Sequence, residues 1–182
     1  MEGGRNVDRT VSRFIRYAEC ASESHNEKAF CEYMEQELAG MGIPFERQEL
    51  GNEVVTDGWN ILARIPGRSG KKPFLFVFHL DTAAPSNQVE VCVEGGCIRS
   101  KGSSVLGADG KLAIAVVMEA VERLMQEGEI NRPIELLFTV CQELGLHGAK
   151  YADYSRIESE EAIVIDHYVT GEVLTRTPAR LY

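Results

Sequence analysis

Three strand-length apolar runs, each followed at once by a polar segment that carries a histidine or a carboxylate, constrain the fold of this chain more than any other feature. The runs are residues 74–78, 134–140 and 162–165, and helical patterns separate them. Buried strands that alternate with helices are typical of βαβ units and a parallel sheet. We therefore predict an α/β fold, a three-layer sandwich with a mostly parallel sheet and helices on both of its faces.

Hydrophobic periodicity and turn residues predict the remaining elements. Ser24-His25-Asn26-Glu27 matches a capping box, so a helix is expected to begin there and to stop near Gly40 and Gly42. Further helices are expected at 7–20, 111–127 and 146–151, further strands at 45–50 and 59–66, and a hairpin at 89–99 with its turn at Gly95-Gly96.

Length, charge and cysteine content exclude several classes of protein. The 182 residues suit one domain, and no apolar run approaches the roughly 20 residues that cross a bilayer. Nineteen Lys and Arg against 28 Asp and Glu give a net charge of −9, which argues against a nucleic-acid partner. The five cysteines form no CxxC pair and the first residues carry no apolar leader, so we expect a cytoplasmic protein with reduced thiols.

The polar residues that follow the apolar runs are candidates for a functional site, because ligands of open α/β sheets bind beyond the carboxyl ends of the strands. Each has a structural explanation alone, such as a helix cap or a hydrogen-bonded core histidine, but their convergence favours a cation that neutralises crowded carboxylates. Imidazole and carboxylate ligands suit Zn²⁺, Co²⁺ or Mn²⁺. The candidates are His79, Asp81, Asp109 in a glycine-flanked turn, Gln142, Glu143 and Asp166.

Three segments then identify a family resemblance. His79-Leu80-Asp81-Thr82, Gly107-Ala108-Asp109-Gly110-Lys111 and the stretch 142–150, followed by Asp166, resemble in order the signatures of the peptidase T/aminoacylase/carboxypeptidase G family. Members are cocatalytic di-zinc exopeptidases, and the similarity to peptidase T-like members is the greatest. The resemblance covers residues 14–182 and predicts a zinc exopeptidase-like fold.

The resemblance also implies a role for each candidate residue. His79 and Asp166 would bind the first metal, Asp109 would bridge two metals, and Glu143 would bind the second. Asp81 would orient the histidine and tune the metal-bound water. The implied cofactor is one or two zinc ions, with cobalt or manganese as alternatives, and the implied substrate is a short peptide or an N-acyl amino acid.

The chain departs from the family pattern at three points. Gln142 stands where the family has the glutamate that serves as general base, whose help is typically worth about 10²–10⁴ in rate. Gly110 stands where the family has a second aspartate after a cis peptide bond. The sequence ends at Tyr182, about where the family chain enters a lid or dimerisation domain and before its final histidine ligand. We therefore expect residues 1–182 to form a single, incomplete catalytic-type domain.

These departures leave more than one function open. The leading hypothesis is a metal-dependent hydrolase of exopeptidase type with weak or no activity in this chain, which binds one metal more tightly than a second. The alternative is a non-catalytic metal-binding or interaction domain, a degenerate relative of the family. A phospho-acceptor domain built on Asp81 or Asp109 is a weaker third reading, because no phosphate-binding loop of the GxxxxGK[ST] type is present. A membrane partner is not expected, and a homo-oligomer remains open.

Overall fold

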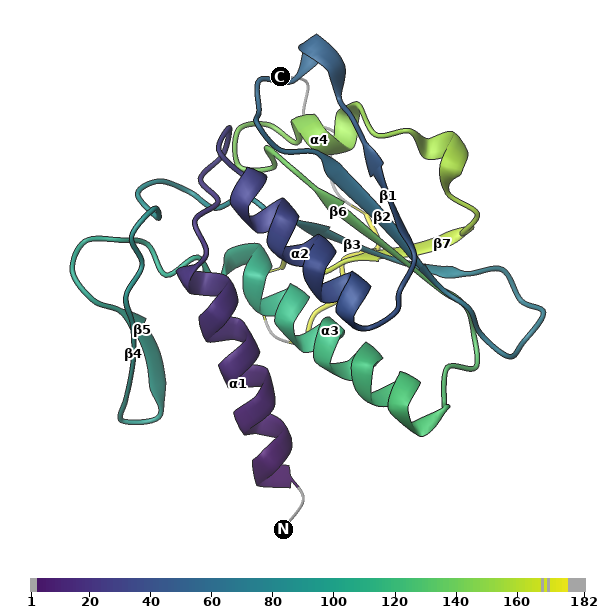
Figure 1. Cartoon of the computed structure of the whole chain (residues 1–182), viewed down its shortest axis with the longest axis horizontal. Coiled ribbons are helices and arrows are strands. Elements are labelled where there is room, and N and C mark those ends of the chain that lie inside the picture. Colours follow the sequence, from purple (N-terminus) through teal and green to yellow (C-terminus); the bar gives the residue numbers. More distant parts are fainter. Residues whose placement is uncertain (1–2, 168, 170, 177–182) are drawn as a thin grey trace.

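A five-stranded mixed sheet is the frame of the computed structural model, which describes residues 3–167, 169 and 171–176 (Figure 1). Its strand order is β1-β2-β6-β3-β7. Strands β6, β3 and β7 run parallel, whereas β1 pairs antiparallel with β2, and β2 antiparallel with β6. The strands are β1 (Phe45–Gln48), β2 (Asn60–Ile65), β3 (Phe74–His79), β6 (Ile134–Thr139) and β7 (Glu161–Val164).

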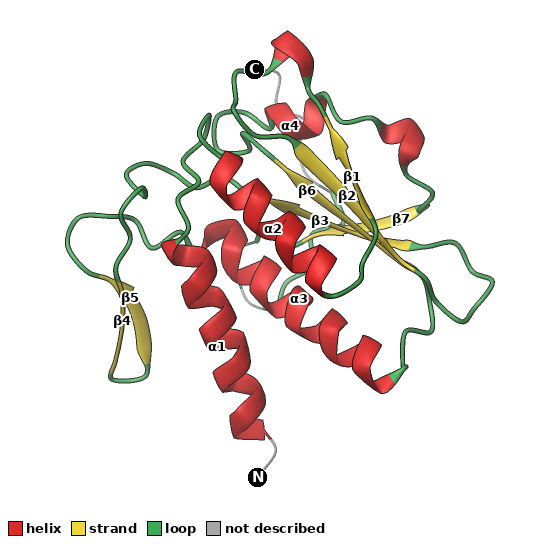
Figure 2. Cartoon of the chain, viewed as in Figure 1, coloured by secondary structure: helices red, strands yellow, loops and turns green. Residues whose placement is uncertain are grey.

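Three helices cover one face of this sheet (Figure 2). They are α1 (Gly3–Glu19), α2 (Lys28–Gly40) and α3 (Ala108–Glu127). Their apolar positions bury a continuous core with the strands, in which Ile114 and Met118 of α3 and Phe138 of β6 are fully buried. The periodicity of residues 111–127 arises because this stripe must face the sheet.

The opposite face has a thinner cover. Leu62, Leu75 and Leu137 form a second buried cluster, against which Ile157 packs. The covering segment includes the short helix α4 (His147–Lys150) and the 3₁₀ helix η2 (Tyr154–Arg156). The predicted α/β sandwich is thus confirmed, with a sheet in which the parallel part is confined to β6, β3 and β7.

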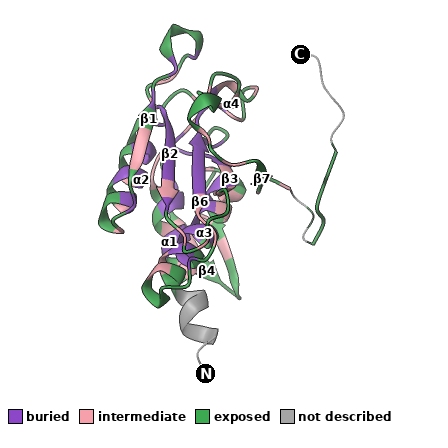
Figure 3. Cartoon of the chain, turned by 90° about the vertical axis from the view of Figure 1, so that its right-hand side faces the viewer, coloured by how far each residue is buried: buried purple, intermediate pink, exposed green. Residues whose placement is uncertain are grey.

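The prediction that residues 162–165 form a buried strand was wrong. Strand β7 occupies the edge of the sheet and pairs with β3 alone, so its outer side lacks a neighbouring strand in the described structure. Ala162 and Val164 are exposed, as Figure 3 shows along β7. An apolar run cannot reveal by itself whether its strand is central or at an edge, because that depends on which other segments pair with it.

The predicted capping box was also wrong. Helix α2 begins at Lys28, and no side chain of the preceding Glu27 caps it. The backbone N–H of Lys28 instead donates to Asp57 Oδ1 at 2.9 Å, so a distant loop supplies the cap. The hydroxyl of Ser24 points elsewhere, to Asp81.

The predicted hairpin is present as a separate two-stranded sheet of β4 (Val91–Glu94) and β5 (Cys97–Ser100). Gly95 and Gly96 form its turn with φ angles of +59° and +78°, which glycine adopts without steric cost. A 3₁₀ helix, η1 (Gly51–Glu53), follows β1. Among the described residues, none of the helices combines the length and apolar character that a membrane crossing needs.

Candidate metal centre

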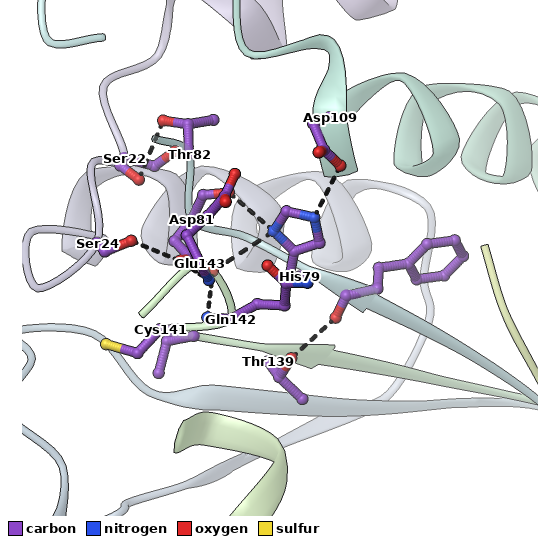
Figure 4. Close-up of polar contacts among 12 residues, drawn as sticks. Ser22, Ser24, His79, Asp81, Thr82, Asp109, Thr139, Cys141, Gln142 and Glu143 are labelled. Carbon is purple, nitrogen blue, oxygen red and sulfur yellow. Dashed lines mark hydrogen bonds and ion pairs between the residues drawn. The ribbon is translucent and has the colours of Figure 1, made fainter. Parts of the chain in front are cut away.

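Side chains from three separate elements meet at the carboxyl ends of the parallel strands. His79 is the last residue of β3, Asp166 follows β7, and Asp109 lies in the first turn of α3. His79 Nε2 is 3.2 Å from Asp109 Oδ1 and 3.7 Å from Asp166 Oδ1 (Figure 4 shows the first of these contacts). One ligand atom from each residue lies within 4.8 Å of the other two. We refer to these three residues as the triad.

The surroundings of the triad favour the protonated form of the His79 imidazole. Burial lowers the pKa of His79, but hydrogen bonds with Asp166 and Asp81 and the charges of both outweigh burial and raise that pKa to about 10. The hydrogen bond with His79 in turn lowers the pKa of Asp166. The hydrogen bonds and negative charges around His79 therefore favour the imidazolium more than burial of the ring disfavours it.

Asp81 lies behind the triad and is completely buried. Its carboxylate accepts hydrogen bonds from Ser24 Oγ at 2.6 Å, from the backbone N–H of Gln142 at 2.9 Å and from that of Glu143 at 3.1 Å. Burial raises the pKa of Asp81, but these bonds and that with His79 lower it overall. The carboxylate is thus held ionised, 3.5 Å from His79 Nδ1. The backbone carbonyl of Asp81 accepts a hydrogen bond from the same nitrogen at 2.9 Å, so the two groups of Asp81 fix the orientation of the ring.

The turn that carries Asp109 requires a glycine at the next position. Gly110 has a φ of +74°, and a Cβ there would lie 2.8 Å from His79 Cε1, Nε2 and O. Glycine at position 110 therefore allows the start of α3 to approach His79. Buried Lys111 ties the same turn to the end of α1, because its Nζ donates to the carbonyl of Cys20 at 2.6 Å.

Gln142 and Glu143 lie in the loop after β6, beside the triad. The amide Nε2 of Gln142 donates to Asp166 Oδ2 at 3.0 Å, a contact that the sequence did not suggest. Burial raises the pKa of Glu143, and so do the negative charges of nearby Asp109 and Asp81. Within the described residues, Glu143 is nevertheless outside the group of mutually close ligand atoms.

Residues that the sequence analysis missed hold this loop in place. Glu27 is buried, and its Oε1 accepts the backbone N–H of Cys141 at 3.0 Å. Buried Asn60 accepts the N–H of Val140 at 3.2 Å and donates to the carbonyl of Gly148 at 2.8 Å. No local signal could have found these contacts, because 80 or more residues separate each side chain from the part of the loop that it binds.

The other three histidines take no part in the triad. His25 contacts the carbonyl of Val55, and His167 pairs with Glu172 at 3.2 Å. His147 begins α4. Among the described residues, none of these three histidines belongs to the group of mutually close ligand atoms.

Comparison with known proteins finds similarity to peptidases. The sequence profile of peptidase family M28 matches residues 60–171. YqjE of Bacillus subtilis, whose own function is uncharacterized, is 28% identical over 96% of this chain and 47% of its own length. Peptidase T of Geobacillus kaustophilus is 27% identical over 90% of this chain and 49% of its own length.

The fold agrees with these sequence relationships. The crystal structure of aminopeptidase PepT from Bacillus cereus superposes with a TM-score of 0.85 and 27% identity, over 88% of this chain and 43% of that one. The chain thus spans about half the length of the relatives that it matches.

Proposed function

The chain belongs to peptidase family M28, and on that premise we propose that it is a metal-dependent hydrolase of exopeptidase type, acting on short peptides or N-acyl amino acids. The observation that carries the proposal is the meeting of His79, Asp109 and Asp166 at one edge of the sheet, with ionised Asp81 behind the histidine. The names of two relatives, a peptidase T and an aminopeptidase, support a peptide substrate.

The chemistry of the triad fits a divalent metal. One imidazole and two carboxylates make three protein ligands, the usual number in a catalytic zinc site, and the same donors suit cobalt or manganese. His79, Asp109 and Asp166 would hold this first metal. Asp109 and Glu143 would hold a second metal more weakly, since only two side chains are at hand. When bound, the metal would polarise a peptide carbonyl and lower the pKa of its water.

The surrounding residues would act on the triad and on the proton of the attacking water. The ring nitrogen Nδ1 of His79, which faces away from the metal position, is hydrogen-bonded to the backbone carbonyl of Asp81 at 2.9 Å, and the Asp81 carboxylate lies 3.5 Å from the same nitrogen. Together they keep Nε2 directed at the triad. Gln142 occupies the position of the general base, but an amide does not take up a proton near neutral pH. The proposal therefore includes weak hydrolysis by this chain, or none.

A second candidate function is a metal-binding domain without catalysis. The specific observation in its favour is the hydrogen bond from Gln142 to Asp166, which turns the residue at the catalytic-base position toward a metal ligand. For either function we propose a cytoplasmic location, supported by the five cysteines, all of which are free thiols in the structure.

Metal titration and peptide hydrolysis together test the proposal. We expect the purified chain to bind Zn²⁺ in calorimetry and to hydrolyse di- and tripeptides slowly once metal is supplied. His79→Ala should abolish both properties, whereas His147→Ala, a histidine outside the triad, should abolish neither. Metal binding without any turnover would favour the non-catalytic function. Failure to bind Zn²⁺ or Co²⁺ would refute the metal centre.

A further inference from the structure

We infer that Gln142 is a positioning residue whose side-chain amide holds Asp166 in place for the first metal. This inference rests on the proposed metal centre and assigns a role to the residue that replaces the general base. The amide Nε2 donates to Asp166 Oδ2 at 3.0 Å. The other oxygen, Oδ1, is the one that lies 3.7 Å from His79 Nε2. One oxygen of the Asp166 carboxylate therefore accepts from the Gln142 amide, and the other lies toward the centre of the triad.

Asp166 needs such support because of its place in the sheet. It follows β7, the edge strand, which ends at Val164 and pairs only with β3. The last backbone hydrogen bond before it, from Ile165 N to the carbonyl of Val77, is long at 3.5 Å. The amide of Gln142 reaches it from the loop after β6, on the far side of β3. The contact therefore joins two segments that no strand pairing connects.

Gln142 is itself held firmly enough to serve as an anchor. Its backbone N–H donates to Asp81 Oδ1 at 2.9 Å, and the N–H of the preceding Cys141 donates to buried Glu27 at 3.0 Å. The amide orientation is also determined, because the opposite orientation would direct a carbonyl oxygen at the carboxylate of Asp166. Each end of the contact thus has a defined geometry.

The type of residue at position 142 decides which of two roles it can have. A glutamine donates a hydrogen bond to a carboxylate, whereas an ionised glutamate only accepts. An ionised glutamate side chain in the same position would bring two negative charges to the distance that the hydrogen bond now spans. The change that removes the proton acceptor therefore supplies a donor that supports a metal ligand.

Gln142→Met tests this role, because methionine has the length of glutamine but no N–H donor. The matched control is Gln126→Met in α3, where Gln126 Nε2 donates to Glu122 Oε1 at 3.1 Å, far along the helix from the triad. Affinity for Zn²⁺ is measured by competition calorimetry, and the ligand environment by the visible absorption of bound Co²⁺. Gln142→Asn, whose amide is one methylene shorter, serves as a second variant.

We expect Gln142→Met and Gln142→Asn to bind Zn²⁺ roughly ten- to a hundredfold more weakly than the unmodified chain, the usual effect of removing a hydrogen bond to a metal ligand. Their Co²⁺ spectra should change as well, whereas Gln126→Met should alter neither property. Unchanged affinity and spectra in both Gln142 variants would overturn the role of Gln142 alone. No Zn²⁺ binding by the unmodified chain would overturn the proposed metal centre and this role with it.

Discussion

Gly110→Ala should damage both the stability of the fold and the triad. An L-residue at a φ of +74° and a ψ of −58°, outside the left-handed helical region, costs roughly 1–3 kcal/mol. The new methyl group would also lie 2.8 Å from the backbone oxygen and the ring of His79. The ring cannot move aside easily, because Asp81 and Asp109 contact its two nitrogens. Overpacking of this kind typically costs about 1–3 kcal/mol, so we expect a total loss of about 2–6 kcal/mol.

Gly128→Ala is the control for a glycine of positive φ that has open space around it. Gly128 ends α3 with a φ of +67°, and nothing lies within 4 Å of its added Cβ. It should therefore lose only the backbone part, about 1–2 kcal/mol. Urea unfolding measures both free energies, and calorimetry measures Zn²⁺ affinity, which should fall for Gly110→Ala alone. Equal destabilisation of the two variants, with Zn²⁺ affinity unchanged in both, would refute the argument that the contact with His79 requires glycine.

Three further outcomes are expected. Zn²⁺ binding at pH 7 should release about one proton, because His79, with a pKa of about 10, is protonated without metal and must become neutral to bind it. The affinity for Zn²⁺ should therefore fall as the pH is lowered. Calorimetry in buffers of different ionisation enthalpy measures this, and a proton count of zero would contradict it. Gln142→Glu should raise peptide turnover at saturating metal, because a carboxylate would stand at the position of the general base. Equal turnover of the variant and the unmodified chain would show that another defect dominates. Arg13→Met should lower the free energy of unfolding by about 1.5–3 kcal/mol, because it removes the closest cation of the Glu119 and Glu122 carboxylates while Arg9 still pairs with both. A urea midpoint equal to that of the unmodified chain would argue against this.

The sequence alone predicted an α/β sandwich and the convergence of the triad. Apolar runs of strand length and a helix of period 3.6 are local patterns, and they predicted β3, β6 and α3 within a few residues. The rule that parallel strands end at one edge of a sheet then brought His79 and Asp166 together without any knowledge of side-chain contacts. Their roles as metal ligands remain a prediction.

Only the tertiary structure decided which distant partner each polar group has. Ser24 stands in a segment whose sequence is typical of a helix cap, yet its hydroxyl donates to Asp81, 57 positions away. Gln142 lies next to Glu143 in the sequence, yet its side-chain amide donates to Asp166, 24 positions away. A residue's chemistry fixes what it can donate or accept, but the packing of segments far apart in the chain selects the partner, since a buried polar group must be satisfied by whatever the fold brings within reach.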